Sequence, residues 1–156
     1  MKKPNIILLV NNVRSIFNTG SIFRTADALG ISKIYLAGNM ATPKSHPNKF
    51  TKTALGSEQK IPWEKIRKVS LIIKKYRRQN YEIVALEKKK NYSLDYRNWT
   101  PKKNILLILG NEITGIPTSI LKQCDKVIEL PMNGIKESLN VGVSLGAIGY
   151  YIISTY

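Results

Sequence analysis

The sequence predicts an α/β domain built on a parallel sheet with helices on both faces. Short apolar runs alternate along the chain with segments whose apolar residues recur at helical spacing. The apolar runs are continuous, as in parallel strands that are buried on both faces. The chain has 156 residues, which is enough for one domain with a real core and too few for two ordinary domains.

Five segments have the pattern of buried strands. Each is short, rich in aliphatic residues and bounded by polar or turn-forming residues. We assign these strands to Ile6–Asn11, Lys33–Ala37, Glu82–Leu86, Ile105–Leu109 and Val127–Leu130.

The segments between the strands favour helices, with one exception. We assign helices to Asn18–Leu29, Trp63–Tyr76, Pro117–Cys124 and Leu139–Tyr156. The helix at Trp63–Tyr76 has an apolar stripe on one side and lysine and arginine on the other. Ala41–Ser57 contains two prolines and a glycine, which predicts a long basic loop, and such loops tend to be functional.

The charge of the chain predicts a polyanionic partner. Lys and Arg number 25 against 10 Asp and Glu, a net charge of +15. Residues 1–59 carry eight basic and two acidic side chains, and residues 60–103 carry fourteen and four. Residues 105–156 carry three and four, so the last third is nearly neutral. A general preference for lysine would not give this distribution, so we expect nucleic acid to contact the first two thirds.

Several classes of protein are disfavoured. The single cysteine, Cys124, excludes an internal disulfide, and one histidine, His46, excludes a Cys/His metal cluster. The apolar run Ile6–Val10 is too short for a signal peptide, and Val141–Ile153 is too short to span a bilayer. We therefore expect a cytoplasmic protein with no metal and no membrane association.

Ligands of such sheets bind in the loops beyond the carboxyl ends of the strands. Four loops are in this position: Asn11–Thr19, Glu87–Tyr92, Gly110–Pro117 and Pro131–Ser138. The third has two glycines at the P-loop interval, but Ile116-Pro117 stands where Lys-Ser/Thr is required. No G-x-G-x-x-G occurs, and carboxylates are scarce. Hydrolase, NTPase and metalloenzyme interpretations are therefore poor.

Five polar residues lie at or near this predicted edge: Asn18, Arg24, Glu112, Ser138 and Asn140. Each has a structural alternative. Asn18 could cap the first helix and Ser138 the last one. Arg24 lies between Phe23 and Ala26, near the apolar stripe, where an unpaired charge is costly, and Glu112 could be its partner.

Three segments together resemble a known family. They are NVRSIFNTGSIFRTADALG (residues 12–30), LLILGNEITGIP (106–117) and IELPMNGIKESLNVGVSLGAIGYY (128–151). These resemble the three motifs of the SpoU/TrmH branch of the SPOUT methyltransferases, and residues 42–58 resemble a substrate-side loop found in part of that family. The resemblance implies transfer of a methyl group from S-adenosyl-L-methionine to a ribose 2′-hydroxyl in tRNA or rRNA, with S-adenosyl-L-homocysteine as product.

The resemblance also implies roles for individual residues. Asn18, Arg24, Glu112, Ser138 and Asn140 match catalytic-site positions, with Arg24 at the position regarded as catalytic. Leu86, Gly110, Leu130 and Leu139 match positions that cradle the cofactor, largely through main-chain groups.

The resemblance has further implications for the whole molecule. It implies a SPOUT fold with a C-terminal trefoil knot and a homodimer with active sites near the interface. Gly142, Gly146 and Gly149 would let helix backbones approach closely, consistent with such packing. We expect residues 1–156 to form a single methyltransferase domain with no separate N-terminal RNA-binding domain.

Arg24 is a poor general base because the pKa of a guanidinium lies above about 12. We expect it to bind the substrate phosphate and to stabilise negative charge on the 2′-oxygen. We expect Arg14, Lys44, Lys49 and Lys52, with the basic clusters at 65–78 and 88–90, to contact RNA phosphates. Two alternatives stay open: a non-catalytic RNA-binding protein and a base methyltransferase of another SPOUT branch.

Overall fold

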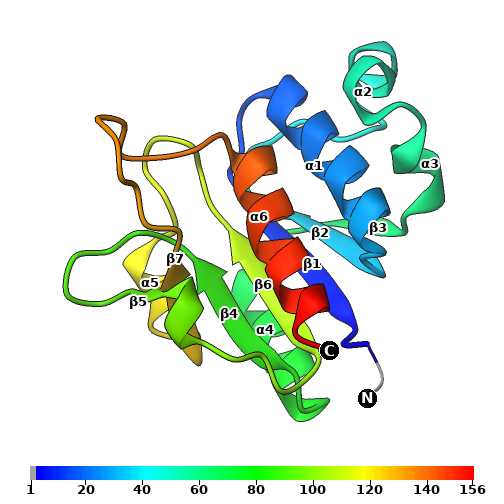
Figure 1. The fold of residues 1–156 in the computed structure, drawn as a ribbon. Helices are drawn as coiled ribbons and strands as arrows, with labels where there is room; N and C mark the ends of the chain where they lie inside the picture. The colour runs from blue at the N-terminus through cyan, green and yellow to red at the C-terminus, as the bar shows by residue number, and fades with distance from the viewer. Residues whose placement is uncertain (1–2) are drawn as a thin grey trace.

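The computed structural model describes residues 3–156 and contains one sheet (Figure 1). Its strands are β1 (Ile6–Asn11), β2 (Lys33–Ala37), β3 (Trp63–Ile66), β4 (Glu82–Leu86), β5 (Leu94–Asp95), β6 (Ile105–Leu109) and β7 (Lys126–Glu129). Their order is β3-β2-β1-β6-β4-β7-β5, and all neighbouring pairs are parallel. All five predicted strands are present, the last one shifted by one residue. The two-residue edge strand β5 was not predicted.

Helices cover both faces of the sheet, which confirms the predicted fold class. They are α1 (Ile16–Leu29), α2 (Pro47–Ala54), α3 (Ser57–Lys60), α4 (Val69–Arg78), η1 (Tyr96–Asn98), α5 (Thr118–Leu121) and α6 (Val141–Ser154). Figure 1 shows α1 and α6 side by side on one face, with α4 on the other. The knot implied for the C-terminal half stays a prediction.

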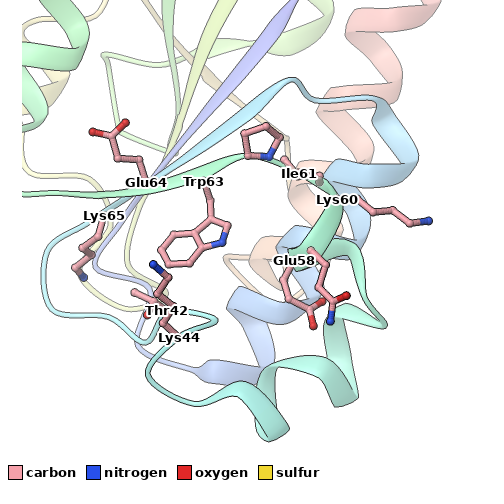
Figure 2. Close-up of a pocket in the computed structure, with 10 residues that line it drawn as sticks. Thr42, Lys44, Glu58, Lys60, Ile61, Trp63, Glu64 and Lys65 are labelled. Carbon is pink, nitrogen blue, oxygen red and sulfur yellow. The ribbon is translucent and has the colours of Figure 1, made fainter.

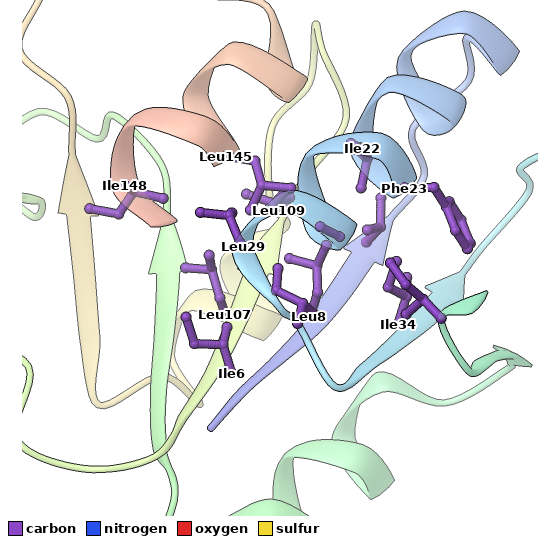
Figure 3. Close-up of a cluster of buried hydrophobic side chains, with 14 of the residues drawn as sticks. Ile6, Leu8, Ile22, Phe23, Leu29, Ile34, Leu107, Leu109, Leu145 and Ile148 are labelled. Atoms are coloured by element: carbon purple, nitrogen blue, oxygen red, sulfur yellow. The ribbon is translucent and has the colours of Figure 1, made fainter. Parts of the chain in front are cut away.

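Two hydrophobic clusters explain why β1 is apolar at consecutive positions. Ile6, Leu8 and Val10 belong to the cluster under α1 and α6, which Figure 3 shows. Ile7 and Leu9 belong to the second cluster, under α4 and α5. Successive side chains of a strand point to opposite faces, so a strand covered on both sides must be apolar throughout.

The prediction of a helix over Trp63–Tyr76 is wrong for its first six residues. Trp63–Ile66 form β3, which pairs with β2, and the helix begins only at Val69. Trp63 packs against one core cluster and Ile66 belongs to the other. A strand sends residues three apart to opposite faces, whereas a helix would place both on one side. The helical spacing in the sequence was therefore coincidental over this stretch.

The predicted loop Ala41–Ser57 contains a helix instead over Pro47–Ala54. Pro47 occupies the first turn of α2, where a missing N–H does no harm. Phe50 and Ala54, one turn apart, are its buried residues, and Phe50 meets Phe23 of α1 edge to face with ring centroids 5.4 Å apart. Only two apolar residues mark this helix, so its sequence pattern was weak.

Two of the three glycines of α6, Gly142 and Gly149, allow close packing within the chain, whereas the sequence suggested packing between protomers. A Cβ on Gly142 would lie 2.6 Å from Ser21 Oγ, and one on Gly149 would lie 2.3 Å from Leu29 Cδ1. Ser21 and Leu29 belong to α1 of the same chain. The close approach that these glycines permit is therefore between α1 and α6.

Candidate active site

A cleft of about 810 Å³ opens at the carboxyl edge of the sheet. It lies among the loops after β4, β6 and β7 and the first turns of α1 and α6. Figure 1 shows the loops after β6 and β7 gathered beside the start of α6. The lining comprises Asn18 and Ser144 with residues 86–90, 109–116, 129, 130, 132 and 137–141. Each of the four segments expected to bind a ligand contributes to this lining.

A chain of hydrogen bonds joins three segments that are distant in sequence. Asn140 donates from Nδ2 to Oδ1 of Asn18 at 2.9 Å, and Asn18 donates from Nδ2 to Oε1 of Glu112 at 2.9 Å. The Glu112 carboxylate also accepts from the backbone N–H groups of Arg14 and Ser15, at 3.3 and 3.4 Å. The structure thus brings Asn18, Glu112 and Asn140 together, and it ties the N-termini of α1 and α6 to the loop after β6.

These bonds control the ionisation of Glu112. Partial burial disfavours the charged carboxylate, but the hydrogen bonds from Asn18 and from backbone N–H groups outweigh it. The pKa of Glu112 is therefore held below its ordinary value. Glu112 is an anion at neutral pH and serves as an acceptor.

The capping residues differ from those suggested by the sequence. Asn140, not Ser138, caps α6, because its Oδ1 accepts from the N–H groups of Gly142 and Val143 at 2.9 and 3.4 Å. Ser15, not Asn18, caps α1, since its side chain accepts from the Asn18 N–H at 3.2 Å. Ser138 is exposed on the cleft lining and has no capping role.

Two residues that the sequence analysis missed shape the loop after β6. Asn111 folds the loop, because its Oδ1 accepts from the N–H groups of Ile113 and Thr114, both at 2.9 Å. Glu87, just beyond β4, accepts from the Ile116 N–H at 2.8 Å. A Cβ on Gly115 would lie 2.4 Å from the Glu87 carboxylate, so only glycine allows this contact. Glu87 was identifiable as the first polar residue after a buried strand.

The four residues expected to hold the cofactor all line this cleft: Leu86, Gly110, Leu130 and Leu139. Leucine side chains from three segments provide apolar walls, and the strand-end loops provide main-chain donors and acceptors. Sites for small organic ligands have a volume of roughly 300–1,000 Å³, and this cleft falls in that range. Its lining offers a cofactor both apolar and polar contacts.

Arg24 lies outside the cleft. It is exposed in the third turn of α1, and the described residues give it no ion pair, so the suggested partnership with Glu112 is wrong. Asn18 takes that place instead. Arg24 follows Asn18 by six residues, which places it about 9 Å further along the helix and on a different side. Its charge is solvated, so the cost of burial anticipated from the sequence does not arise.

The residues expected to contact RNA are exposed. Arg14 follows β1 at the rim of the cleft, and Lys49 and Lys52 project from α2. Lys44 lies near Trp63 in a separate hollow. The loop 88–90 adds three lysines directly to the cleft lining.

Within residues 3–156, no group of three or more His, Cys, Asp or Glu is placed to hold a metal ion. Over the same residues, no helix has the length and apolar character needed to cross a bilayer.

The fold and the cleft define a class: α/β proteins that bind a small organic ligand at the carboxyl edge of a parallel sheet. Comparison with known proteins defines the family. Residues 5–150 match the model of the SpoU rRNA Methylase family, and the chain belongs to that family. The resemblance predicted from the three motifs is thereby confirmed.

Individual relatives agree with this membership. The chain is 29% identical over 149 residues to a tRNA (guanosine(18)-2′-O)-methyltransferase of Aquifex aeolicus, covering 96% of this chain and 69% of that protein. A solved structure of the A. aeolicus TrmH/SpoU tRNA modifying enzyme superposes with a TM-score of 0.84 at 27% identity, covering 99% of this chain and 76% of that one.

An AdoMet-bound rRNA methyltransferase from Sinorhizobium meliloti also superposes with a TM-score of 0.84 at 27% identity. That match covers 97% of this chain and 56% of the other. Two Staphylococcus relatives are likewise longer, and the chain spans 59% and 57% of them. Many relatives thus extend well beyond the part that this chain matches.

Proposed function

We propose that the protein is an S-adenosyl-L-methionine-dependent methyltransferase that acts on the ribose 2′-hydroxyl of a nucleotide in tRNA or rRNA. One observation carries the proposal: the four residues expected to hold the cofactor share a single cleft with Asn18, Glu112, Ser138 and Asn140. The family membership and the charge of +15 support it. The Aquifex relative, which is named for 2′-O-methylation of tRNA, supports the ribose as the target.

Methyl transfer depends mainly on how the protein positions the two reactants, and it needs no covalent intermediate with the protein. When bound, S-adenosyl-L-methionine supplies a methyl group on a sulfonium centre, which is already an activated leaving group. The protein must align the ribose oxygen with that methyl, assist loss of the hydroxyl proton and exclude water. A new C–O bond forms as the C–S bond breaks, and the sulfur keeps the electron pair.

Asn18, Glu112 and Asn140 act as positioning residues in this proposal. Their polar groups bond to one another and to backbone N–H groups, so they fix the cleft walls. Ser138 has its hydroxyl available beside them. The Leu86, Gly110, Leu130 and Leu139 positions hold the cofactor.

Arg24 stabilises the developing oxyanion in this proposal, and it does so from a second protomer. In its own chain it lies on a different side of α1 from the cleft residue Asn18, so a partner must bring a guanidinium to each cleft. A dimer is supported by the exposed apolar residues of α1 and α6, namely Phe17, Val143 and Tyr150, which are 65%, 56% and 55% exposed. A partner that covered these side chains would remove apolar surface from water.

RNA contacts come from this domain itself in the proposal. Arg14 and Lys88–Lys90 flank the cleft, and Lys49 and Lys52 extend the basic surface along α2. The binding of RNA should therefore weaken steeply as salt concentration rises.

Nucleoside analysis of cellular RNA tests the proposed function. RNA from cells lacking the protein should lose one 2′-O-methylnucleoside, and the wild-type gene should restore it. A variant with Arg24→Ala should fail to restore it. Loss of a base-methylated nucleoside instead would support the alternative of a base methyltransferase, and an unchanged nucleoside profile would support a non-catalytic RNA-binding protein.

A further inference from the structure

A second cleft, separate from the first, lies beside the edge strand β3 (Figure 2). Its volume is about 710 Å³, and it is bounded by the segment after β2, by α3 and by β3. The lining combines one aromatic ring, that of Trp63, with the side chains of Lys44, Lys60 and Lys65. None of these residues lines the cleft at the carboxyl edge.

Trp63 is fixed but only half-buried. Part of its side chain packs against the core cluster beneath α1, and the rest lines the second cleft. Figure 2 shows the indole facing open space with the Lys44 ammonium beside it, and Lys44 Nζ lies 6.0 Å from a ring centroid. The other tryptophan, Trp99, is only 3% exposed. An aromatic ring held on a strand and open on one side is a platform on which a base can stack.

Hydrogen bonds of neighbouring residues fix the segments that surround Trp63. Lys65 donates from Nζ to the carbonyl oxygens of Gly38 and Met40, at 2.5 and 3.2 Å, which anchors the turn that leads to Lys44. Glu58 is 8% exposed on the inner wall, and its Oε1 accepts from Thr51 Oγ1 at 2.8 Å, which ties α3 to α2. Lys44 and Lys60 are exposed, so their ammonium groups are available to an anion.

We propose that the second cleft binds an unpaired nucleotide of the RNA substrate, with its base stacked on Trp63 and a phosphate beside Lys44. The proposal rests on the proposed function, because that function supplies an RNA. A nucleotide needs both a flat apolar surface and a cation a few ångströms away, and this cleft offers both. A partner that is only anionic would use the lysines and leave the ring unused.

Tryptophan fluorescence tests the proposal on the wild-type protein. Trp99 is buried, so quenching by an added oligonucleotide reports stacking on Trp63. We expect saturable quenching by a short single-stranded oligouridine and little quenching by uridine monophosphate at the same nucleotide concentration. No quenching by the oligouridine would overturn the proposal. Equal quenching by the mononucleotide would also overturn it, because the cleft would then be a site for free nucleotides.

Two substitutions at Trp63 separate stacking from apolar packing. Trp63→Phe keeps a ring and should bind the oligouridine almost as well as the wild type. Trp63→Leu keeps an apolar side chain without a ring and should bind about tenfold more weakly or worse. Thermal unfolding of both variants checks that they are folded. Equal affinities of two folded variants would contradict stacking.

The phosphate contact is tested by Lys44→Gln, with Lys122→Gln, just after α5, as the matched control. Removal of one phosphate contact should reduce the slope of log affinity against log salt by about 1. We expect that reduction for Lys44→Gln and no reduction for Lys122→Gln. Equal slopes for the two variants would contradict the contact.

Failure of this inference is distinguishable from failure of the proposed function. The binding experiments need no cofactor and no catalysis. Methyl transfer to RNA without quenching would overturn only the proposal that the second cleft binds a nucleotide. Quenching without any methyl transfer would overturn the proposed function and leave the nucleotide subsite supported.

Discussion

At the scale of single residues, the polar groups of the cleft mostly form hydrogen bonds with one another and with the backbone. Asn18 bonds to Glu112 and Asn140, and Asn140 also caps α6. Glu87 holds the backbone of the loop after β6. Such bonds fix main-chain positions, so substitutions here should act on ligand binding through the shape of the cleft.

Glu87→Ala should weaken cofactor binding without unfolding the protein. The substitution removes a charge-assisted hydrogen bond to the Ile116 N–H, a contact that contributes about 1.5–3 kcal/mol. If the loop then loses its bound shape, affinity for S-adenosyl-L-homocysteine should fall about tenfold or more. Isothermal titration calorimetry measures this effect, with Glu137→Ala on the same cleft as the control. Equal affinities of the two variants would show that Glu87 does not order the site.

Ionised Glu112 should stabilise the fold at neutral pH and lose that effect as the pH falls. Hydrogen bonds lower its folded pKa below the ordinary value of 4.5, so its contribution is fully present above that value. The contribution is lost as pH falls through the folded pKa. The free energy of unfolding of the wild type should therefore decline relative to that of Glu112→Gln as the pH is lowered from 5 to about 3. Urea denaturation across this range measures it, and parallel curves for the two proteins would contradict the assignment.

At the scale of elements, the packing of α6 on α1 orients the cleft, because Asn18 and Asn140 lie at the first turns of these helices. Gly149→Ala should destabilise the fold by about 1–3 kcal/mol, since the new Cβ would lie 2.3 Å from the buried Leu29. Gly146→Ala is the matched control. Its Cβ would lie 3.7 Å from Thr25 Cγ2, an ordinary contact, so better helix propensity should keep it neutral or stabilise it by up to about 1 kcal/mol.

Chemical denaturation of the two glycine variants measures this difference. A Gly149→Ala protein as stable as Gly146→Ala would mean that α1 and α6 are not tightly packed at this point.

The elements also show where sequence reasoning succeeds. Buried parallel strands have a continuous apolar pattern, so β1, β2, β4 and β6 were predicted with their bounds. The edge strand β3 has two exposed residues among its four. Its apolar residues, Trp63 and Ile66, are three positions apart, which is also the spacing of a helix. The short helix α2 has only two buried residues and shows little pattern. Both errors fall where few buried side chains define the element.

The candidate site was predictable in part for similar reasons. Strand-end loops meet at one edge of a parallel sheet, so the sequence could place the four loops around one cleft. The pairing of Asn18 with Glu112, in place of Arg24, could not be predicted. It depends on the sides of α1 that these residues occupy, and that orientation is set by contacts with α2 and α6.

At the scale of the whole molecule, the proposal that Arg24 acts on the cleft of a second protomer can be tested with two variants. Arg24→Ala and Gly110→Ala should each be inactive. The second should fail because a Cβ on Gly110 would lie 2.7 Å from the backbone of Gly115 and Ile116. If Arg24 acts on the cleft of the partner, a mixed dimer of the two variants contains one native site.

An equal mixture of the two variants, unfolded and refolded together, should therefore recover about a quarter of wild-type methyl transfer. Each variant refolded alone is the control, and analytical ultracentrifugation checks that dimers form. A mixture as inactive as its components would place Arg24 outside the partner's site.

The most direct test of the central claim is the chemical position of the transferred methyl group. The protein is incubated with labelled S-adenosyl-L-methionine and RNA from cells that lack it, and the RNA is then hydrolysed in alkali. Alkali cleaves beside free 2′-hydroxyls only, so ribose methylation predicts label in alkali-stable dinucleotides. Label confined to mononucleotides would contradict the account, because the methyl group would then be on a base.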